Sequence, residues 1–153
     1  MNKIPLPAEF NDPLHEMLGF QLRRTSNGVM AALTAELAPL GILPSEASLL
    51  MMIGANPGCT QSDVSRALRA QPANMVPLIN KLVQAGSIER EQGKGRAIAL
   101  TLTTAGNQLY GDVAAAFERH EARISRSLPQ ELRDKLIPAL MQICKNACCN
   151  DAD

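Results

Sequence analysis

The stretch from Thr60 to Leu102 constrains the fold most, because its pattern of apolar residues changes period along its length. Its first half repeats apolar residues every three or four positions, in two short segments, as one face of a helix does. Its second half holds two strand-like segments, 87–90 and 97–102, around the basic, glycine-rich sequence 92–96. The order helix, turn, helix and hairpin predicts a winged helix-turn-helix.

Capping residues indicate where these two helices begin and end. Thr60 is a good N-cap, and Asp63 three residues later makes an approximate capping box. We expect Asn74 to cap the second helix, which would leave Pro77 in its first turn, where its missing N–H costs nothing. Gly86 is expected to end that helix in the left-handed conformation.

Helical periodicity continues on both sides of this stretch, while residues 1–12 are expected to be a loose arm. Further helices are expected from Pro13 to about Pro39, from Pro44 to about Asn56, from Thr103 to Leu128 and from Pro129 to Cys149. Pro138 should kink or divide the last of these. The expected fold class is therefore mainly α with a small β-hairpin wing.

The 153 residues suit a single domain with three parts. A winged helix lobe spans about 44–102, and the flanking helices span about 13–40 and 103–149. Because the flanking helices carry more apolar surface than the small lobe can cover, we expect them to pack on a second copy as a homodimer. Such a dimer would place two recognition helices about one DNA turn apart, on a pseudo-palindromic site.

Charge favours nucleic acid only locally. The whole chain balances 15 basic against 15 acidic residues, but residues 60–101 hold six basic and three acidic side chains. Lysine and arginine supply most of the sequence-independent affinity for DNA phosphates. No acid and base pair, phosphate loop or nucleophile with a histidine partner is apparent, so we expect no enzyme, no cofactor and no metal site. No apolar run approaches the roughly 20 residues of a membrane span, and a cytoplasmic location is expected.

The predicted DNA contacts lie on the two short helices and the hairpin tip. They are Thr60, Gln61, Ser62, Arg69, Ala73, Asn74, Pro77, Leu78, Lys81, Lys94 and Arg96. Asn74 can bind adenine and Pro77 can contact a thymine methyl, although an asparagine that caps a helix cannot easily do both. Leu78 falls in the apolar stripe of its helix, which favours a core position for it over base contact.

Four short sequences resemble the MarR family of bacterial transcriptional regulators. They are PSE at 44–46, NPGCTQSDV at 56–64, GSIER at 86–90 and, the most specific, LTTAG at 102–106. The resemblance covers about residues 13–147 and implies a homodimer that binds promoter DNA, usually as a repressor, and is released by a small ligand. One departure is Lys94, which stands where the family wing commonly has Asp, two residues before the wing arginine at Arg96.

Two further sequences, GFQLRR at 19–24 and PANMVPL at 72–78, look like the branch that senses aromatic acids or their coenzyme A thioesters. Arg23 and Arg24 are candidates to hold the carboxylate or phosphate of such an effector. The candidates to line an apolar pocket for it are His15, Phe20, Met51, Met52 and Phe117. The alternatives are solvated or ion-paired arginines, and methionines and phenylalanines that simply pack in the core.

Two other functions compete with a ligand-responsive repressor. The sequence CxxxCC, formed by Cys144, Cys148 and Cys149, could make the chain a thiol- or metal-responsive regulator, although two cysteines on one helical face are only half of a zinc site. Alternatively, the chain could be a protein-interaction module that keeps a winged helix without binding DNA.

Overall fold

The computed structural model describes residues 11–93 and 97–148 of the chain, and the predicted contacts Lys94 and Arg96 lie outside them. Its elements in chain order are α1 (Leu18–Leu37), the 3-10 helix η1 (Ala38–Leu40), α2 (Pro44–Ala55), β1 (Cys59–Thr60), α3 (Gln61–Ala67), α4 (Pro72–Gln84), β2 (Ile88–Gln92), β3 (Ile98–Leu102), α5 (Thr104–Ser125) and α6 (Gln130–Cys148). The mainly helical fold with a small β wing is confirmed.

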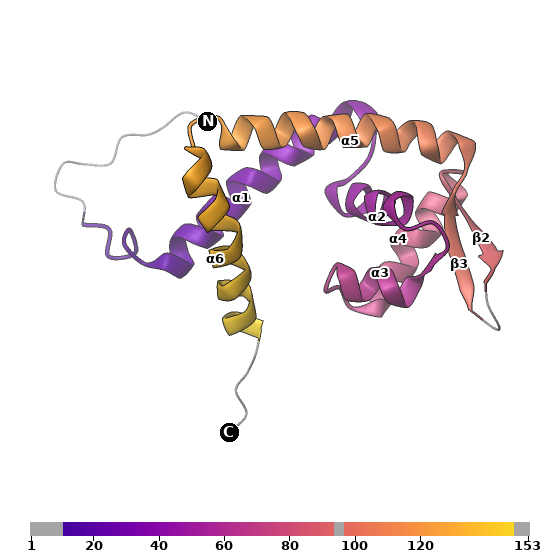
Figure 1. Ribbon diagram of the computed structural model, residues 1–153, viewed down its shortest axis with the longest axis horizontal. Coiled ribbons are helices and arrows are strands. Elements are labelled where there is room, and N and C mark those ends of the chain that lie inside the picture. The colour runs from indigo at the N-terminus through magenta and orange to yellow at the C-terminus, as the bar shows by residue number, and fades with distance from the viewer. Residues whose placement is uncertain (1–10, 94–96, 149–153) are drawn as a thin grey trace, which may run out of the picture.

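The helix α5 runs along one edge of the molecule and connects its two ends (Figure 1). Elements α2 to α4 and the sheet gather at the N-terminal end of α5, and we refer to them, residues 44–102, as the lobe. Helix α1 packs along α5, and α6 descends from the other end of α5. The lobe therefore lies at one end of α5, and α6 lies at the other.

The sheet has three strands in the order β1-β3-β2, all antiparallel, where the sequence predicted a two-stranded hairpin. In the added strand, Cys59 pairs with Leu100 and Thr60 with Ala99. The turn before it allows this pairing, because Gly58 adopts a φ of 83° and its N–H donates to the Leu100 carbonyl at 3.0 Å. The extra strand fixes the start of α3 against the wing.

The hydrophobic core lies between α2, α4, the sheet and the middle of α5. Helix α2 is central, as predicted, because Leu49, Leu50 and Ile53 are completely buried. Other elements contribute the buried residues Leu37, Met75, Ile79, Leu82, Ile88, Leu100, Val113 and Ala116. In contrast, none of the residues described in α6 is buried.

The first helix begins later than predicted, at Leu18 and not at Pro13. Two consecutive turns precede it, because the Asp12 carboxylate accepts from the N–H of Leu14 at 3.0 Å and its carbonyl accepts from the N–H of His15. An aspartate before a proline favours such a turn over a helix. The prediction that a helix starts at Pro13 is therefore wrong.

The end of α5 differs from the prediction, and of the kink or division predicted for α6 the division is wrong. Helix α5 ends at Ser125, and a turn closed by the Leu128 N–H and the Ser125 carbonyl carries the chain to α6. Helix α6 is not divided at Pro138 but runs unbroken from Gln130 to Cys148. Pro138 and Asp134 are both exposed, so water can bond the Asp134 carbonyl that the proline leaves without an N–H donor.

Among the described residues, no single helix is long and apolar enough to cross a membrane. The segments Leu18–Leu40 and Pro44–Ala55 reach that length and hydrophobicity only when they are counted together, and the chain bends by 74° between them.

Candidate nucleic-acid interface

The start of α3 is held by the predicted capping box. The Thr60 hydroxyl accepts from the Asp63 N–H at 3.2 Å, and the Asp63 carboxylate accepts from the Thr60 N–H at 3.0 Å and from its hydroxyl at 2.7 Å. The Thr60 hydroxyl and then its N–H lower the pKa of Asp63. Thr60 is therefore committed to the cap, whereas the neighbouring Ser62 is exposed and Gln61 half-buried at the helix start.

Helix α4 begins three residues before the start that an Asn74 N-cap would give. Gln71 is its N-cap and Pro72 takes the first helical position, where the fixed φ of proline is favourable and its missing N–H is no loss. The prediction that Asn74 caps this helix is therefore wrong. Asn74 is the third helical residue and exposed, so its side chain is free of the capping role that competed with base contact.

The exposed side of α4 carries the residues predicted to contact bases. Ala73, Asn74 and Pro77 are exposed, while Met75, Ile79 and Leu82 on the opposite side are buried in the core. Pro77 lies inside the helix, not in its first turn as predicted, so the Ala73 carbonyl lacks its usual intrahelical donor. Leu78 is half-buried against the core, in agreement with the core alternative.

Two polar contacts hold α4 in place within the lobe. The Lys81 ammonium bonds the Glu46 carboxylate at 2.5 Å, and the second oxygen of Glu46 accepts from the Leu43 N–H at 3.1 Å at the start of α2. Arg90 in β2 donates to the Asn80 side-chain oxygen at 2.6 Å. Lys81, a predicted phosphate contact, is thus paired with a carboxylate that is only 3% exposed, although its own side chain is 58% exposed.

Arg69 occupies an unusual place at the turn between α3 and α4. Its φ of 50° is the one positive value among the described non-glycine residues. The turn is closed behind α3 by hydrogen bonds from the Arg69 N–H to the Arg66 carbonyl and from the Ala70 N–H to the Ser65 carbonyl. Its exposed guanidinium donates to the Cys144 sulfur at 3.2 Å, so the predicted phosphate contact reaches toward α6.

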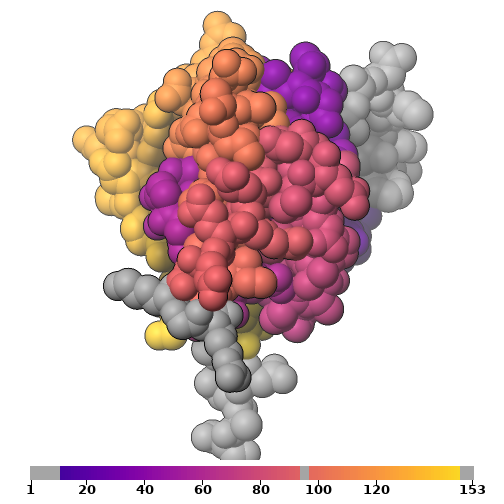
Figure 2. All heavy atoms as spheres, turned by 90° about the vertical axis from the view of Figure 1, so that its right-hand side faces the viewer, coloured from indigo at the N-terminus to yellow at the C-terminus, as the bar shows by residue number. Residues whose placement is uncertain are grey.

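The wing packs beside α4 on the face that Figure 2 presents. Strands β2 and β3 pair in register from Ile88 with Leu102 to Gln92 with Ile98, and the Gly93 N–H continues the ladder to the Ala97 carbonyl. Beyond Ile88, the residues of β2 are exposed, which leaves Glu89, Arg90 and Glu91 on the surface. The wing is thus a regular hairpin projecting from the same side of the lobe as α4.

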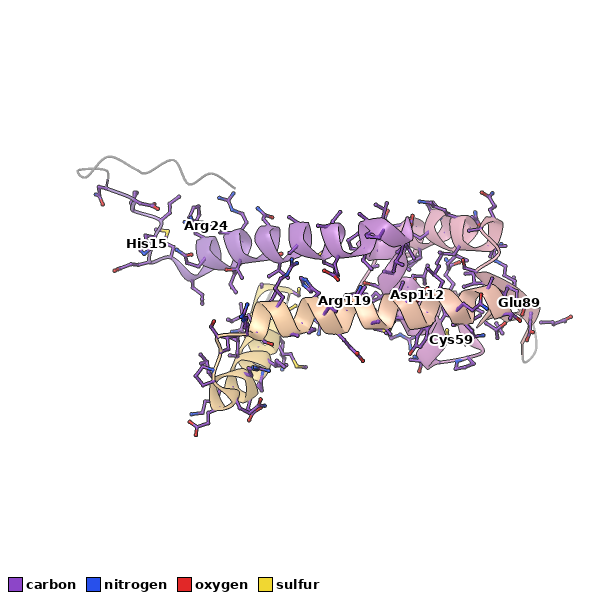
Figure 3. All side chains as sticks on the ribbon, turned by 90° about the horizontal axis from the view of Figure 1, so that it is seen from above. His15, Arg24, Cys59, Glu89, Asp112 and Arg119 are labelled. Atoms are coloured by element: carbon purple, nitrogen blue, oxygen red, sulfur yellow. The ribbon has the colours of Figure 1, made fainter. Side chains whose placement is uncertain are left out.

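The residues predicted to bind an effector do not meet in one protomer. His15 and Arg24 lie at one end of the molecule, while Cys59 in the lobe lies toward the other (Figure 3). Phe20 and Arg23 share the α1 end, with the Arg23 guanidinium 5.1 Å from the centre of the Phe20 ring. Met51, Met52 and Phe117 are half-buried and pack against the core.

A cavity of 310 Å³ lies between α2 and α3, where the sequence predicted only Met52. Its lining residues are Met52, Asn56, Cys59, Asp63, Val64 and Ala67. Burial, followed by the charge of Asp63, raises the pKa of the Cys59 thiol. The Asp63 carboxylate in its wall disfavours an anionic ligand here.

Two exposed cysteines of α6 lie one helical turn apart. Cys144 and Cys148 are exposed, with their sulfur atoms 4.0 Å apart, and Cys149 lies outside the described residues. Within residues 11–93 and 97–148, no three His, Cys, Asp or Glu side chains gather around a possible metal position. The thiol and metal alternative therefore has two of the four ligands that a structural zinc ion takes.

Comparisons with known proteins agree on the family. The MarR family model matches residues 40–97. The HTH-type transcriptional regulator BilQ of Clostridium symbiosum is 32% identical over 114 residues, which are 72% of this chain and 78% of BilQ. The HTH-type transcriptional repressor Rv2887 of Mycobacterium tuberculosis is 30% identical over 118 residues, which are 74% of this chain and 85% of Rv2887.

Solved structures of the transcriptional repressor CouR have the same fold. CouR bound to a 23-mer DNA duplex superposes with a TM-score of 0.80 at 26% identity, covering 88% of this chain and 99% of CouR. CouR bound to p-coumaroyl-CoA superposes with a TM-score of 0.76 at 29% identity, covering 86% and 94%. The chain therefore belongs to the MarR family and is a DNA-binding transcriptional regulator, not an enzyme.

Proposed function

We propose that the chain is a homodimeric repressor that binds a pseudo-palindromic operator, with α4 of each protomer in a major groove. The observation that carries this proposal is the two-sided character of α4, which buries Met75, Ile79 and Leu82 and exposes Asn74 and Pro77. An asparagine amide can form two hydrogen bonds to adenine, and an apolar ring suits the methyl group of thymine. Because such a repressor acts on chromosomal DNA, we also propose a cytoplasmic location.

The homodimer is supported by the apolar surface of the terminal helices. Helix α6 exposes Leu132, Leu136, Ile137, Leu140 and Met141, and the start of α1 with the segment before it adds Leu14, Met17 and Leu18. Ile137 and Met141 are more than 60% exposed, which is costly in water for side chains of this size. A two-fold partner would cover this surface and place two α4 helices about 34–36 Å apart, one turn of DNA.

The proposed effector is an aromatic acid or an aromatic acyl-CoA. The support is the relative CouR, solved with p-coumaroyl-CoA, together with two adjacent arginines on α1. Arg23 and Arg24 are both exposed, and a carboxylate or a phosphate is the anion that a guanidinium binds best. We assign the anionic end of the effector to these arginines and not to the 310 Å³ cavity, whose wall carries the Asp63 carboxylate.

Fluorescence anisotropy with a labelled duplex from the region upstream of the gene tests the proposal. We expect tight binding that weakens steeply between two salt concentrations, because bound phosphates release counterions. A scrambled duplex of equal length is the control. Aromatic acids and their coenzyme A thioesters are then added, and at least one should release the protein. Release by peroxide or metal alone would favour the cysteines, and no binding to any duplex would reject the proposal.

Two variants separate the DNA contact from the effector contact. Asn74→Ala should weaken operator binding by about 1–3 kcal/mol and relax specificity at one base pair, with little change on the scrambled duplex. The double variant Arg23→Ala/Arg24→Ala should bind the operator normally but require about tenfold more effector for release. Equal loss on both duplexes for Asn74→Ala, or unchanged release for the arginine variant, would contradict the respective assignment.

A further inference from the structure

The end of α4, the root of the wing and the start of α5 meet at Thr103. Helix α4 ends in two hydrogen bonds typical of a left-handed cap, from Gly86 N–H to the Val83 carbonyl and from Ser87 N–H to the Leu82 carbonyl, both 2.9 Å. Gly86 has a φ of 69°, as this motif requires. The recognition helix therefore passes into β2 through a well-defined turn.

One hydroxyl connects this turn to α5. The Thr103 Oγ1 donates to the Gly86 carbonyl at 2.6 Å and accepts from the Gly106 N–H at 3.0 Å, as the N-cap of α5. The Thr103 N–H also donates to the Ser87 carbonyl at 3.1 Å. The Thr103 side chain is thus an N-cap for α5 and, through its donated proton, a link to the end of α4.

The backbones at this junction are packed too closely to slide. A Cβ atom added to Gly106 would lie 1.8 Å from the Ser87 carbonyl oxygen, far inside contact distance. Ser87 itself is only 6% exposed. The start of α5 therefore rests directly on the chain that leaves α4, with glycine as the one residue that fits there.

We propose that Thr103 is a positioning residue that fixes the angle between α4 and α5, and thereby the half-site spacing that the dimer accepts. This inference rests on the proposed function, in which two copies bind two half-sites. Helix α4 has 13 residues and is about 20 Å long. A swing of about 10° around its C-terminal end would move its N-terminal turn, with Asn74, by about 3.4 Å, the rise of one base pair.

Substitutions at Thr103 can separate the donor role of its hydroxyl from its acceptor role. Thr103→Asp keeps an excellent N-cap for α5, so the fold should persist, but a carboxylate has no proton to donate to the Gly86 carbonyl. Thr103→Ser keeps both roles and is the matched control. Asn107→Ala is a second control, because the Asn107 side chain bonds the Thr103 carbonyl at 2.9 Å at the start of α5 and makes no hydrogen bond to Gly86 or Ser87 in the described structure.

The test compares binding to duplexes whose half-sites are one base pair closer, correctly spaced and one base pair farther apart. For the natural chain and Thr103→Ser, a one-base-pair change should cost tenfold or more in affinity, since it also rotates one half-site by about 34°. For Thr103→Asp, the same ratio should fall to about threefold or less. The added charge is the same on every duplex, so it cancels in the ratio.

A spacing ratio in Thr103→Asp equal to that of the natural chain would overturn the inference. So would a ratio lowered to the same extent in Asn107→Ala, since fraying of α5 would then be sufficient. A second readout needs no DNA: the distribution of distances between spin labels at Ala73→Cys in the dimer, with all native cysteines replaced by serine. It should broaden in Thr103→Asp and not in Thr103→Ser. A natural chain that binds no duplex would instead contradict the proposed function.

Discussion

The lobe and α6 differ in how their apolar side chains are buried within the protomer. In the lobe, α2 buries Leu49, Leu50 and Ile53 completely, and even its acidic residue Glu46 is enclosed and paired. Helix α6 is longer than α2 but buries none of its described residues and leaves Ile137 and Met141 more than 60% exposed. Both helices contain leucine, isoleucine and methionine, but α2 has one charged residue whereas α6 has five, so the apolar residues of α6 form one face of an amphipathic helix.

The difference indicates where each helix finds its free energy. Helix α2 is stabilised within the protomer by contacts from α4, α5 and β3. Helix α6 buries none of its described residues and is linked to the lobe by the hydrogen bond from Arg69 to Cys144. Most of the stability of a helix in a protein comes from packing of its apolar face, which α6 lacks within the protomer. In the proposed homodimer, a second copy would cover the apolar face of α6, as the other elements of the protomer cover α2.

The largest expected effect is the loss of a lobe leucine. Leu50→Ala should lower the free energy of unfolding by about 2–5 kcal/mol, because it leaves a cavity in a fully buried site. Leu140→Ala in α6, where the leucine is 41% exposed, should cost about 0.5 kcal/mol or less in dilute protein. Urea denaturation measures both, and equal losses would contradict the contrast between the two helices.

A charge on α6 should act on assembly and not on the fold of the lobe. Ile137→Asp is expected to weaken dimerisation by about 2–4 kcal/mol, since it places a carboxylate in an apolar interface. Sedimentation equilibrium measures the change, and operator affinity should fall with it. The matched control is Asn146→Asp, which adds the same single negative charge at an exposed polar position of the same helix. Dimerisation lost equally in both variants would reject Ile137 as an interface residue.

Sequence patterns predicted those features that depend on neighbours in the chain. The capping box of Thr60 and Asp63, the left-handed Gly86 and the N-cap Thr103 each need only three or four adjacent residues. The order of helices and the central place of α2 also followed from periodicity. The position of Asn74 was misjudged because Gln71 and Pro72 start the helix earlier, although asparagine is intrinsically the better N-cap.

Features that depend on contacts between residues far apart in the chain were not predicted from the sequence. Strand β1 is two residues long and exists only because β3 pairs with it. Glu46 is buried because Lys81, 35 residues later, neutralises it, and no local pattern connects the two. The candidate effector residues were chosen for their residue type, which does not determine their positions in space. The structure therefore places those of α1 and those of α2 in different regions of the protomer.

The two ion pairs found among the described residues allow a finer test of the contrast. Lys81→Met should cost about 1–3 kcal/mol, because it leaves a carboxylate that is 3% exposed with one fewer hydrogen bond. Arg119→Met removes the 2.6 Å partner of Glu36, which lies between α1 and α5 with its side chain 23% exposed. Solvent screens that pair, so the loss should be smaller. Urea denaturation at neutral pH compares them, and a larger effect for Arg119→Met would contradict the ranking.

The smallest effect concerns the capping box of α3 and depends on pH. Hydrogen bonds from Thr60 lower the pKa of Asp63 below its ordinary value of 3.8, so ionised Asp63 stabilises the folded chain at neutral pH. That contribution is fully present above pH 3.8 and is lost as the pH falls through the lowered pKa of the folded state. Asp63→Asn should therefore melt at a lower temperature than the natural chain at pH 7, and this difference in melting temperature should shrink toward pH 3.

The control is Asp112→Asn, which replaces an exposed carboxylate without a hydrogen bond in the described structure and should show no such difference. A difference of equal size at both pH values for Asp63→Asn would mean that shape, and not the charge of Asp63, supports the start of α3.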